Sequence, residues 1–111
     1  MWLTSFYLEV LMSVFMILRV PGDPNTLEQY ANDNAEMMQR IAAEGRAAGA
    51  TRHAFAGGDN EILVIDEWPN AEAFQRFFDT QQEIPRLMQE GGAQGAPEIS
   101  IYRKLDTPDE F

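Results

Sequence analysis

Four short segments of the sequence have the length and composition of β-strands. They span residues 13–20, 51–56, 61–68 and 98–105. The first is almost continuously apolar, which is typical of a strand covered on both faces. The last alternates apolar and polar residues, as expected for a strand with one buried face. A Pro-Gly-Asp-Pro turn follows the first strand, and residues 57–60 predict a hairpin loop between the second and third.

The segment between the first two strands has the apolar period of a long helix. Asp23 or Asn25 is expected to cap its start and Gly49 its end. The stripe predicted to be buried comprises Leu27, Tyr30, Ala31, Asn34, Met38, Ile41, Ala42 and Gly45. Asn34 thus lies near the centre of an otherwise apolar face, which makes its amide a candidate polar group inside a pocket.

A second helix is predicted directly after the third strand. Pro69 ends that strand because it lacks a backbone N–H donor, and Asn70 caps the helix. One helix face carries Phe74, Phe77, Phe78 and, near its centre, Gln81. The ring of Pro85 clashes with the carbonyl of the preceding turn, so we expect a break there and a separate helical piece over residues 84–90.

The predicted element order is β-α-β-β-α-β, which indicates an α+β, ferredoxin-like domain over residues 13–105. Its four-stranded antiparallel sheet has both helices on one face. The first and third strands are apolar on both faces, so the open face of the sheet needs a cover. A second copy of the chain supplies one, and we therefore predict a two-fold homodimer. Residues 106–111 form an acidic C-terminal tail that is expected to be loose.

Residues 1–12 form an N-terminal extension of a different character. Their apolar run resembles a signal peptide only in part, because it has no basic start, no small-residue cleavage site, and Glu9 interrupts it. Glu9 and Arg19 also argue against a membrane span. Two interpretations stay open. The segment is an extension upstream of a natural start at Met12, or it packs as an extra strand or short helix.

Charge and cysteine content narrow the classes of function. The formal net charge of the 111 residues is -10, from 18 acidic and 8 basic residues, with no basic patch. Nucleic acid and anionic membrane are therefore not expected as partners. The absence of cysteine excludes disulfides, thiolate metal sites and cysteine nucleophiles. It is compatible with the cytoplasm, which is the location we predict.

Two stretches of the chain resemble the antibiotic biosynthesis monooxygenase family of dimeric α+β barrels. They are SVFMILRVPGDP, at the first strand and turn, and EILVIDEWPNAEAFQRFFDTQQ, and the likeness extends over residues 13–105. The resemblance implies oxidation of quinol- or anthrone-like aromatics by O₂ without metal or flavin, or degradation of haem. The haem-degrading branch uses a histidine where this chain has Phe77 or Phe78, and an asparagine that the first strand lacks. Haem degradation is thus disfavoured, whereas the family's tryptophan matches Trp68.

A candidate site is expected between the sheet and the helices, where an apolar pocket with few polar groups would form. Met38, Trp68, Phe74, Phe77 and Phe78 are candidates for its wall, and Tyr30, Asn34, His53 and Gln81 for its polar groups. His53, the only histidine, is a candidate general base near neutral pH. A structural role is the more common one for a lone histidine on a strand. With one histidine and no cysteine, we expect no metal.

The two amides and the tryptophan each allow two interpretations. Asn34 and Gln81 either bond to each other or the backbone, or they hold a substrate carbonyl or phenolate. Trp68 either lines the pocket or belongs to the core or the dimer interface.

Three functions are consistent with these patterns. The first is a cofactor-independent monooxygenase acting on a small aromatic substrate, with His53 as base. The second is a non-catalytic dimer that binds a small hydrophobic ligand or a partner protein. The third is a cofactor-free isomerase or cyclase that uses the same base without O₂.

Overall fold

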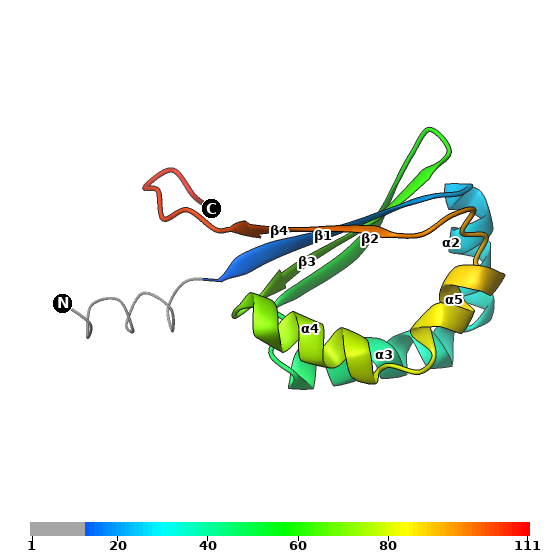
Figure 1. Cartoon of the computed structure of the whole chain (residues 1–111), viewed down its shortest axis with the longest axis horizontal. Coiled ribbons are helices and arrows are strands. Elements are labelled where there is room, and N and C mark those ends of the chain that lie inside the picture. The colour runs from blue at the N-terminus through cyan, green and yellow to red at the C-terminus, as the bar shows by residue number, and fades with distance from the viewer. Residues whose placement is uncertain (1–12) are drawn as a thin grey trace.

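A computed structural model describes residues 13–111 of the chain, and the interpretations that concern residues 1–12 lie outside the described part. Eight elements follow one another (Figure 1). The strands are β1 (Val14–Pro21), β2 (Arg52–Gly58), β3 (Glu61–Trp68) and β4 (Glu98–Arg103). The helices are α2 (Pro24–Asp33), α3 (Ala35–Ala47), α4 (Ala71–Thr80) and α5 (Ile84–Glu90). The fourth strand ends two residues before Leu105, where the alternating pattern had placed its end.

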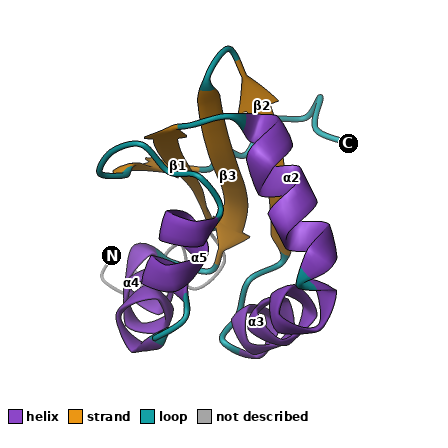
Figure 2. Cartoon of the chain, turned by 90° about the vertical axis from the view of Figure 1, so that its right-hand side faces the viewer, coloured by secondary structure: helices purple, strands orange, loops and turns teal. Residues whose placement is uncertain are grey.

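The sheet confirms the predicted ferredoxin-like α+β fold. Its strand order is β2-β3-β1-β4, and every neighbouring pair is antiparallel. The helices lie on one face of this sheet, and the opposite face carries none of them (Figure 2). Among residues 13–111, no helix combines the length and apolar character that crossing a membrane requires.

Each predicted helix is divided into two. The break before Pro85 is confirmed: α4 ends at Thr80, and Pro85 lies in the first turn of α5, where a missing N–H costs nothing. The continuous helix over residues 23–49 is wrong, because Asn34 separates α2 from α3 with φ -122° and ψ 41°. Its side-chain Nδ2 donates to the carbonyl oxygen of Tyr30 at 2.8 Å. Asparagine favours such breaks because its amide competes for backbone partners.

The two helix starts are capped as predicted. The side chain of Asp23 accepts from the backbone N–H of Asn25 at 2.9 Å, and Asn70 Oδ1 accepts from Ala73 at 2.8 Å. Each bond satisfies one backbone donor that would otherwise lack a partner at the helix start. Asp23, of the two residues considered, is therefore the cap of the first helix.

The hydrophobic core lies between the sheet and the helices. Alternate residues of β1 and β3 point into it and meet side chains from α2, α4 and α5. The buried core residues are Met16, Leu18, Val20, Leu27, Ile62, Trp68, Ala73, Phe74 and Leu87. The intervening residues of the same strands, such as Ile17 and its cross-strand partner Ile65, lie on the open face. Ile65 is 38% exposed there, which leaves apolar surface that the helices do not cover.

Candidate active site

A cavity of about 100 Å³ lies between the sheet and helices α3 and α4. Its walls are almost entirely apolar. They include Met38, Ile41, Trp68, Phe74, Phe77 and Phe78. The polar side chains at the cavity are those of His53, from β2, and Asp66, from β3. An apolar hollow with a few convergent polar groups is the usual form of a small-molecule site.

Aromatic side chains fix the shape of one wall. The Trp68 ring lies 5.8 Å from that of Phe74, edge to face, and 5.3 Å from that of Phe77, centroid to centroid. Trp68 is 1% exposed and Phe74 is 2% exposed, so neither ring has room to turn away. Trp68 thereby fulfils both interpretations made from the sequence, since it belongs to the core and also lines the cavity.

The pairing of β2 with β3 places His53 directly opposite Asp66. His53 Nδ1 lies 2.7 Å from Asp66 Oδ1, and the indole N–H of Trp68 donates to Asp66 Oδ2 at 3.1 Å. Both carboxylate oxygens thus have a partner, as a carboxylate that is only 6% exposed requires. The three side chains form one hydrogen-bonded chain that we call the His-Asp-Trp chain.

The His-Asp-Trp chain sets the tautomer of the histidine. Because a carboxylate only accepts, Nδ1 carries the hydrogen, and Nε2 is left with a lone pair that can accept a proton. The side chain of His53 is 42% exposed, whereas that of Asp66 is 9% exposed. The base therefore lies where a ligand can reach it, while the carboxylate that orients it is shielded from water.

Sequence reasoning missed Asp66, because it placed the hairpin loop at residues 57–60, whereas Gly57 and Gly58 belong to β2 and are paired with β3. The hairpin pairs Gly58 with Glu61, so its loop has two residues, and the second of them, Asn60, has a positive φ of 50°. Such a loop fixes the register of both strands. Counting back from Gly58 and forward from Glu61 brings His53 opposite Asp66, on the face that carries Trp68.

The structure brings six of the nine predicted site residues together at the cavity: Met38, His53, Trp68, Phe74, Phe77 and Phe78. The other three, Tyr30, Asn34 and Gln81, are not among the residues that line it. Asn34 donates to the Tyr30 carbonyl, as described above. Gln81 follows the last residue of α4 with φ -85° and ψ 107°, so it has left the helical face on which the periodicity had placed it.

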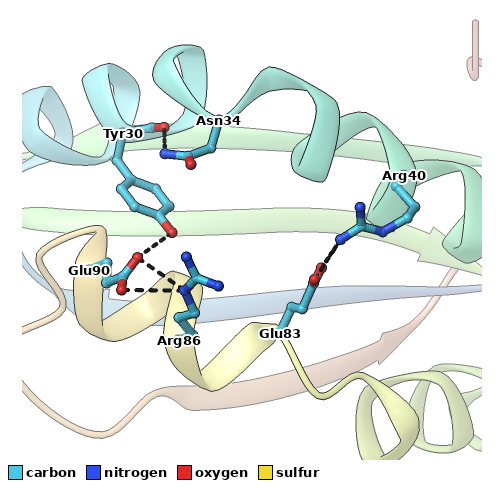
Figure 3. Close-up of polar contacts among 6 residues, drawn as sticks. All are labelled: Tyr30, Asn34, Arg40, Glu83, Arg86 and Glu90. Carbon is cyan, nitrogen blue, oxygen red and sulfur yellow. Dashed lines mark hydrogen bonds and ion pairs between the residues drawn. The ribbon is translucent and has the colours of Figure 1, made fainter.

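Tyr30 belongs to a separate polar cluster between α2 and α5 (Figure 3). Its hydroxyl donates to Glu90 Oε1 at 2.8 Å, and Arg86 Nε donates to the same carboxylate at 3.3 Å. The hydrogen bond to the Glu90 carboxylate raises the pKa of the Tyr30 phenol. Farther along, Arg40 of α3 pairs with Glu83 at the start of α5. These bonds tie the helices to one another and leave the Tyr30 hydroxyl engaged outside the cavity.

The described residues offer no metal centre. No group of three or more histidine, cysteine, aspartate or glutamate side chains that could hold an ion occurs within residues 13–111. What the cavity provides instead is one oriented base, one indole and a wall of hydrocarbon. This arrangement can bind an aromatic molecule and remove a proton from it.

Fold and cavity together define a ferredoxin-like domain with an internal apolar site, and solved structures share this fold. SnoaB, a cofactor-independent oxygenase from Streptomyces nogalater, has 20% sequence identity and a TM-score of 0.59 over 89% of this chain and 99% of that one. The monooxygenase ActVA-Orf6 of Streptomyces coelicolor, solved with nanaomycin D, has 13% identity and a TM-score of 0.63 over 86% of this chain and 90% of that one.

A dimeric ferredoxin-like protein from an uncultured marine organism has 13% identity and a TM-score of 0.63 over 93% of this chain and 96% of that one. A Nitrosomonas europaea protein assigned provisionally to the antibiotic biosynthesis monooxygenases also matches. The chain thus has the fold of these monooxygenases, which confirms the resemblance at the level of the fold. No family model and no curated protein sequence matches it.

Proposed function

We propose that this protein is a cofactor-independent monooxygenase of a small phenolic or anthrone-like aromatic molecule, with His53 as the general base. The observation that carries the proposal is the His-Asp-Trp chain, which engages Nδ1 of His53 and leaves its Nε2 unbonded within residues 13–111, on a residue that lines an apolar cavity. The shared fold with a cofactor-independent oxygenase and a monooxygenase supports it. A shared fold does not imply a shared activity, so the proposal depends on the residues of the site.

The reaction begins with proton removal. His53 Nε2 takes the proton of a phenolic O–H or of an acidic ring C–H, and the Asp66 carboxylate stabilises the imidazolium that forms. The substrate carbanion then gives an electron pair to O₂, which forms a C–O bond and a peroxide. His53 gives its proton to the peroxide, which becomes a hydroperoxide. His53 then removes the second C–H proton, which forms the C=O bond, breaks the O–O bond and releases hydroxide, and it returns that proton to the hydroxide. One CH₂ and one O₂ thereby give one C=O and one water.

The walls of the cavity contribute by excluding water. In a medium of low dielectric, the attraction between the imidazolium and the substrate anion is much stronger than in water. The aromatic rings of Trp68, Phe74 and Phe78 offer flat surfaces for stacking a substrate ring. The reacting anion is then formed beside its counter-charge and away from competing proton donors.

Replacement of His53 tests the proposal. We expect His53→Ala to lower the rate of O₂ consumption, with anthrone as the probe, by about two to four powers of ten, the usual contribution of a general base. The rate is measured with an oxygen electrode, above the rate without protein. Gln75→Ala, on the exposed side of α4, is the matched control and retains full activity. An unchanged rate in His53→Ala would remove this residue from the mechanism.

A second function uses the same base without O₂. An isomerase or cyclase needs only the proton transfer that the His-Asp-Trp chain supports, and this observation favours it as the alternative. Incubation of the probe under argon separates the two. Product that forms without O₂, and depends on His53, identifies the isomerase. A ligand that binds and is never converted identifies the non-catalytic binder.

We also propose that the protein acts as a homodimer joined through the open face of the sheet. That face carries Phe15, Ile17, Leu63, Ile65 and Tyr102, and Tyr102 is 55% exposed. An apolar sheet face of this kind is usually covered in the working assembly. The dimeric neighbour supports the proposal. Native mass spectrometry is expected to give a dimer for the natural sequence and a monomer for Ile65→Lys, and a monomeric natural chain would contradict it.

A further inference from the structure

A second hollow lies on the same side of the sheet as the cavity. It is an open groove of about 340 Å³ between α2 and β2. Leu27 and Ala31 line it from the helix, and Phe55 and Gly57 line it from the strand. We call this hollow the outer groove. Phe55 lines the cavity as well, so one side chain borders both spaces.

Phe55 is placed to separate the two spaces. It lies directly opposite Val64, another cavity residue, and so points toward the helices. Its ring meets that of His53 edge to face, with 5.3 Å between the centroids and an angle of 82° between the planes. Phe55 therefore stands beside the proposed base, at the boundary between the cavity and the outer groove.

The position of Phe55 also allows its ring to move. β2 is an edge strand, and Phe55 is 36% exposed. Phe74, which lines the cavity from α4, is 2% exposed and is held by its neighbours. A change of rotamer on a surface edge strand costs little, whereas one in a close-packed core requires the core to expand. Of these two phenylalanines, Phe55 is the one that can swing aside.

The cavity is small for the substrate class proposed above. Its volume is about 100 Å³. An engineered apolar cavity of about 150 Å³ in another protein holds one benzene molecule. At about two thirds of that volume, the cavity has room for one aromatic ring at most, and the rest of a larger ligand needs room elsewhere. The outer groove, reached past Phe55, offers that room.

We propose that Phe55 divides one elongated binding site into two subsites and thereby determines which ligands it accepts. The cavity takes the reacting ring beside His53, and the outer groove takes the remainder of the ligand when Phe55 turns. The inference rests on the proposed function, which places the reacting ring at His53. It adds a second subsite and a residue that controls access to it.

The rim of the outer groove indicates the chemistry of that remainder. Asn25 and Asn32 offer amide donors and acceptors, and Glu28 adds a negative charge. The chain as a whole has a net charge of -10. A carboxylate would be repelled by this field, whereas a hydroxyl, an amide or an amine would find a partner. The ligand is therefore an extended aromatic molecule whose outer part is neutral or cationic and forms hydrogen bonds.

A pair of ligands of different length tests the division. The probes are phenol, with one ring, and 1,8-dihydroxyanthraquinone, with three, and their dissociation constants are measured by calorimetric titration of the full chain. Ala31→Phe fills the outer groove. We expect it to weaken binding of the three-ring probe about tenfold, the scale of one lost well-packed contact, and to leave phenol unchanged. Equal effects on both probes, or no effect on the larger one, would overturn the proposal.

Removal of the divider gives the opposite result. Phe55→Ala is expected to strengthen binding of the three-ring probe about fivefold, because the ligand no longer has to displace a ring. Phe55→Leu keeps an apolar side chain at the boundary, and its affinity for the three-ring probe is expected to lie between that of the natural chain and that of Phe55→Ala. The matched control is Ile101→Ala, since Ile101 is 38% exposed on the helix side of β4 and lines neither hollow. A weaker three-ring complex in Phe55→Ala would show that Phe55 is a contact and not a divider.

These titrations are independent of turnover. If Ala31→Phe and Phe55→Ala behave as expected but O₂ is not consumed, the proposal of two subsites is supported and the proposal of an oxygenase is contradicted. If His53→Ala abolishes O₂ consumption while Ala31→Phe leaves the dissociation constant of the three-ring probe unchanged, the proposal of an oxygenase is supported and the proposal of an outer subsite is contradicted.

Discussion

Asp66 and Glu67 are neighbours on β3, and their side chains lie on opposite faces of the sheet. Asp66 faces the helices and bonds to His53 and Trp68. Glu67 faces the open side, where Ser13 Oγ donates to it at 2.7 Å and Arg52 and Lys104 lie within 3.5 Å. Both carboxylates are largely buried, and both have a partner for each oxygen.

Asp66 and Glu67 differ in whether one of their partners keeps a group that can react. The partners of Glu67 include two cations, so its charge is neutralised within the cluster and no reactive group is left over. One partner of Asp66 is an imidazole whose second nitrogen remains able to accept a proton at an apolar cavity. A buried carboxylate thus indicates a site only when it orients a group that reacts. Adjacent residues of the same type allow this distinction to be tested by matched substitutions.

The largest effect is expected from Asp66→Asn. Trp68 can only donate, so its indole N–H keeps the amide oxygen on its side and the amide NH₂ faces His53. Nδ1 must then accept, the ring hydrogen moves to Nε2, and the base is lost while the shape is retained. We expect O₂ consumption to fall by about two to four powers of ten, as for other wrong-tautomer variants of an aspartate-oriented histidine.

Glu67→Gln is the control for that experiment, since it makes the same chemical change one residue away on the other face. Its turnover is expected to stay within about threefold of the natural chain, because no partner of Glu67 reaches the cavity. Equal losses in the two variants would mean that both act through stability. An active Asp66→Asn variant would mean that His53 is not the base.

A smaller effect is expected from Ser13→Ala, which removes a hydrogen bond to Glu67 and lowers the free energy of unfolding. The hydrogen bond from Ser13 is the main cause that lowers the pKa of Glu67 below its ordinary value of 4.5, and Lys104 and Arg52 act in the same direction. A lowered pKa in the folded state stabilises the protein above pH 4.5, and this stability is lost as the pH falls through the folded value. Ser13→Ala is expected to reduce the free energy of unfolding at pH 7 by about 1–2 kcal/mol.

Urea denaturation at pH 7 and at progressively lower pH measures that effect, since protonation of Glu67 removes most of what Ser13 contributes. The difference between Ser13→Ala and the natural chain is therefore expected to shrink as the pH falls. A difference that stays constant would assign the loss to packing at Ser13 and not to the charge of Glu67.

The fold could be predicted from the sequence because its signals are local. Pro21 to Pro24 end the first strand, a hairpin within residues 57–60 reverses the chain, and Asn70 starts α4. Each of these depends on residues only a few positions apart. The hairpin loop itself is shorter than predicted, because Gly57 and Gly58 belong to β2. The break at Asn34 is local as well, but a periodicity count gives no weight to a side chain that bonds to its own helix.

The apolar wall of the site could be predicted and most of its polar groups could not. Phe74 and Phe78 follow from the period of α4, and Trp68 follows from the alternation of β3. Tyr30 was expected in the pocket, yet its partner is Glu90, sixty positions along the chain. No residue near Tyr30 in the sequence predicts that its hydroxyl bonds to Glu90. Asp66 was missed for a different reason, since the loop expected at residues 57–60 sets a register in which His53 does not lie opposite it.

The smallest effect is expected from Tyr30→Phe, which removes the hydroxyl that bonds to Glu90 and nothing else. The bond is exposed and Arg86 still neutralises the carboxylate, so we expect only a small loss in the free energy of unfolding and no change in turnover. Urea denaturation and the oxygen electrode measure the two quantities on the same sample. Because a pocket role for Tyr30 was inferred from the sequence, this variant also decides between the two placements. A fall in turnover of tenfold or more with stability unchanged, a factor worth about 1.4 kcal/mol in the barrier, would return the hydroxyl to the catalytic site. It would also mean that the Glu90 bond opens when substrate binds.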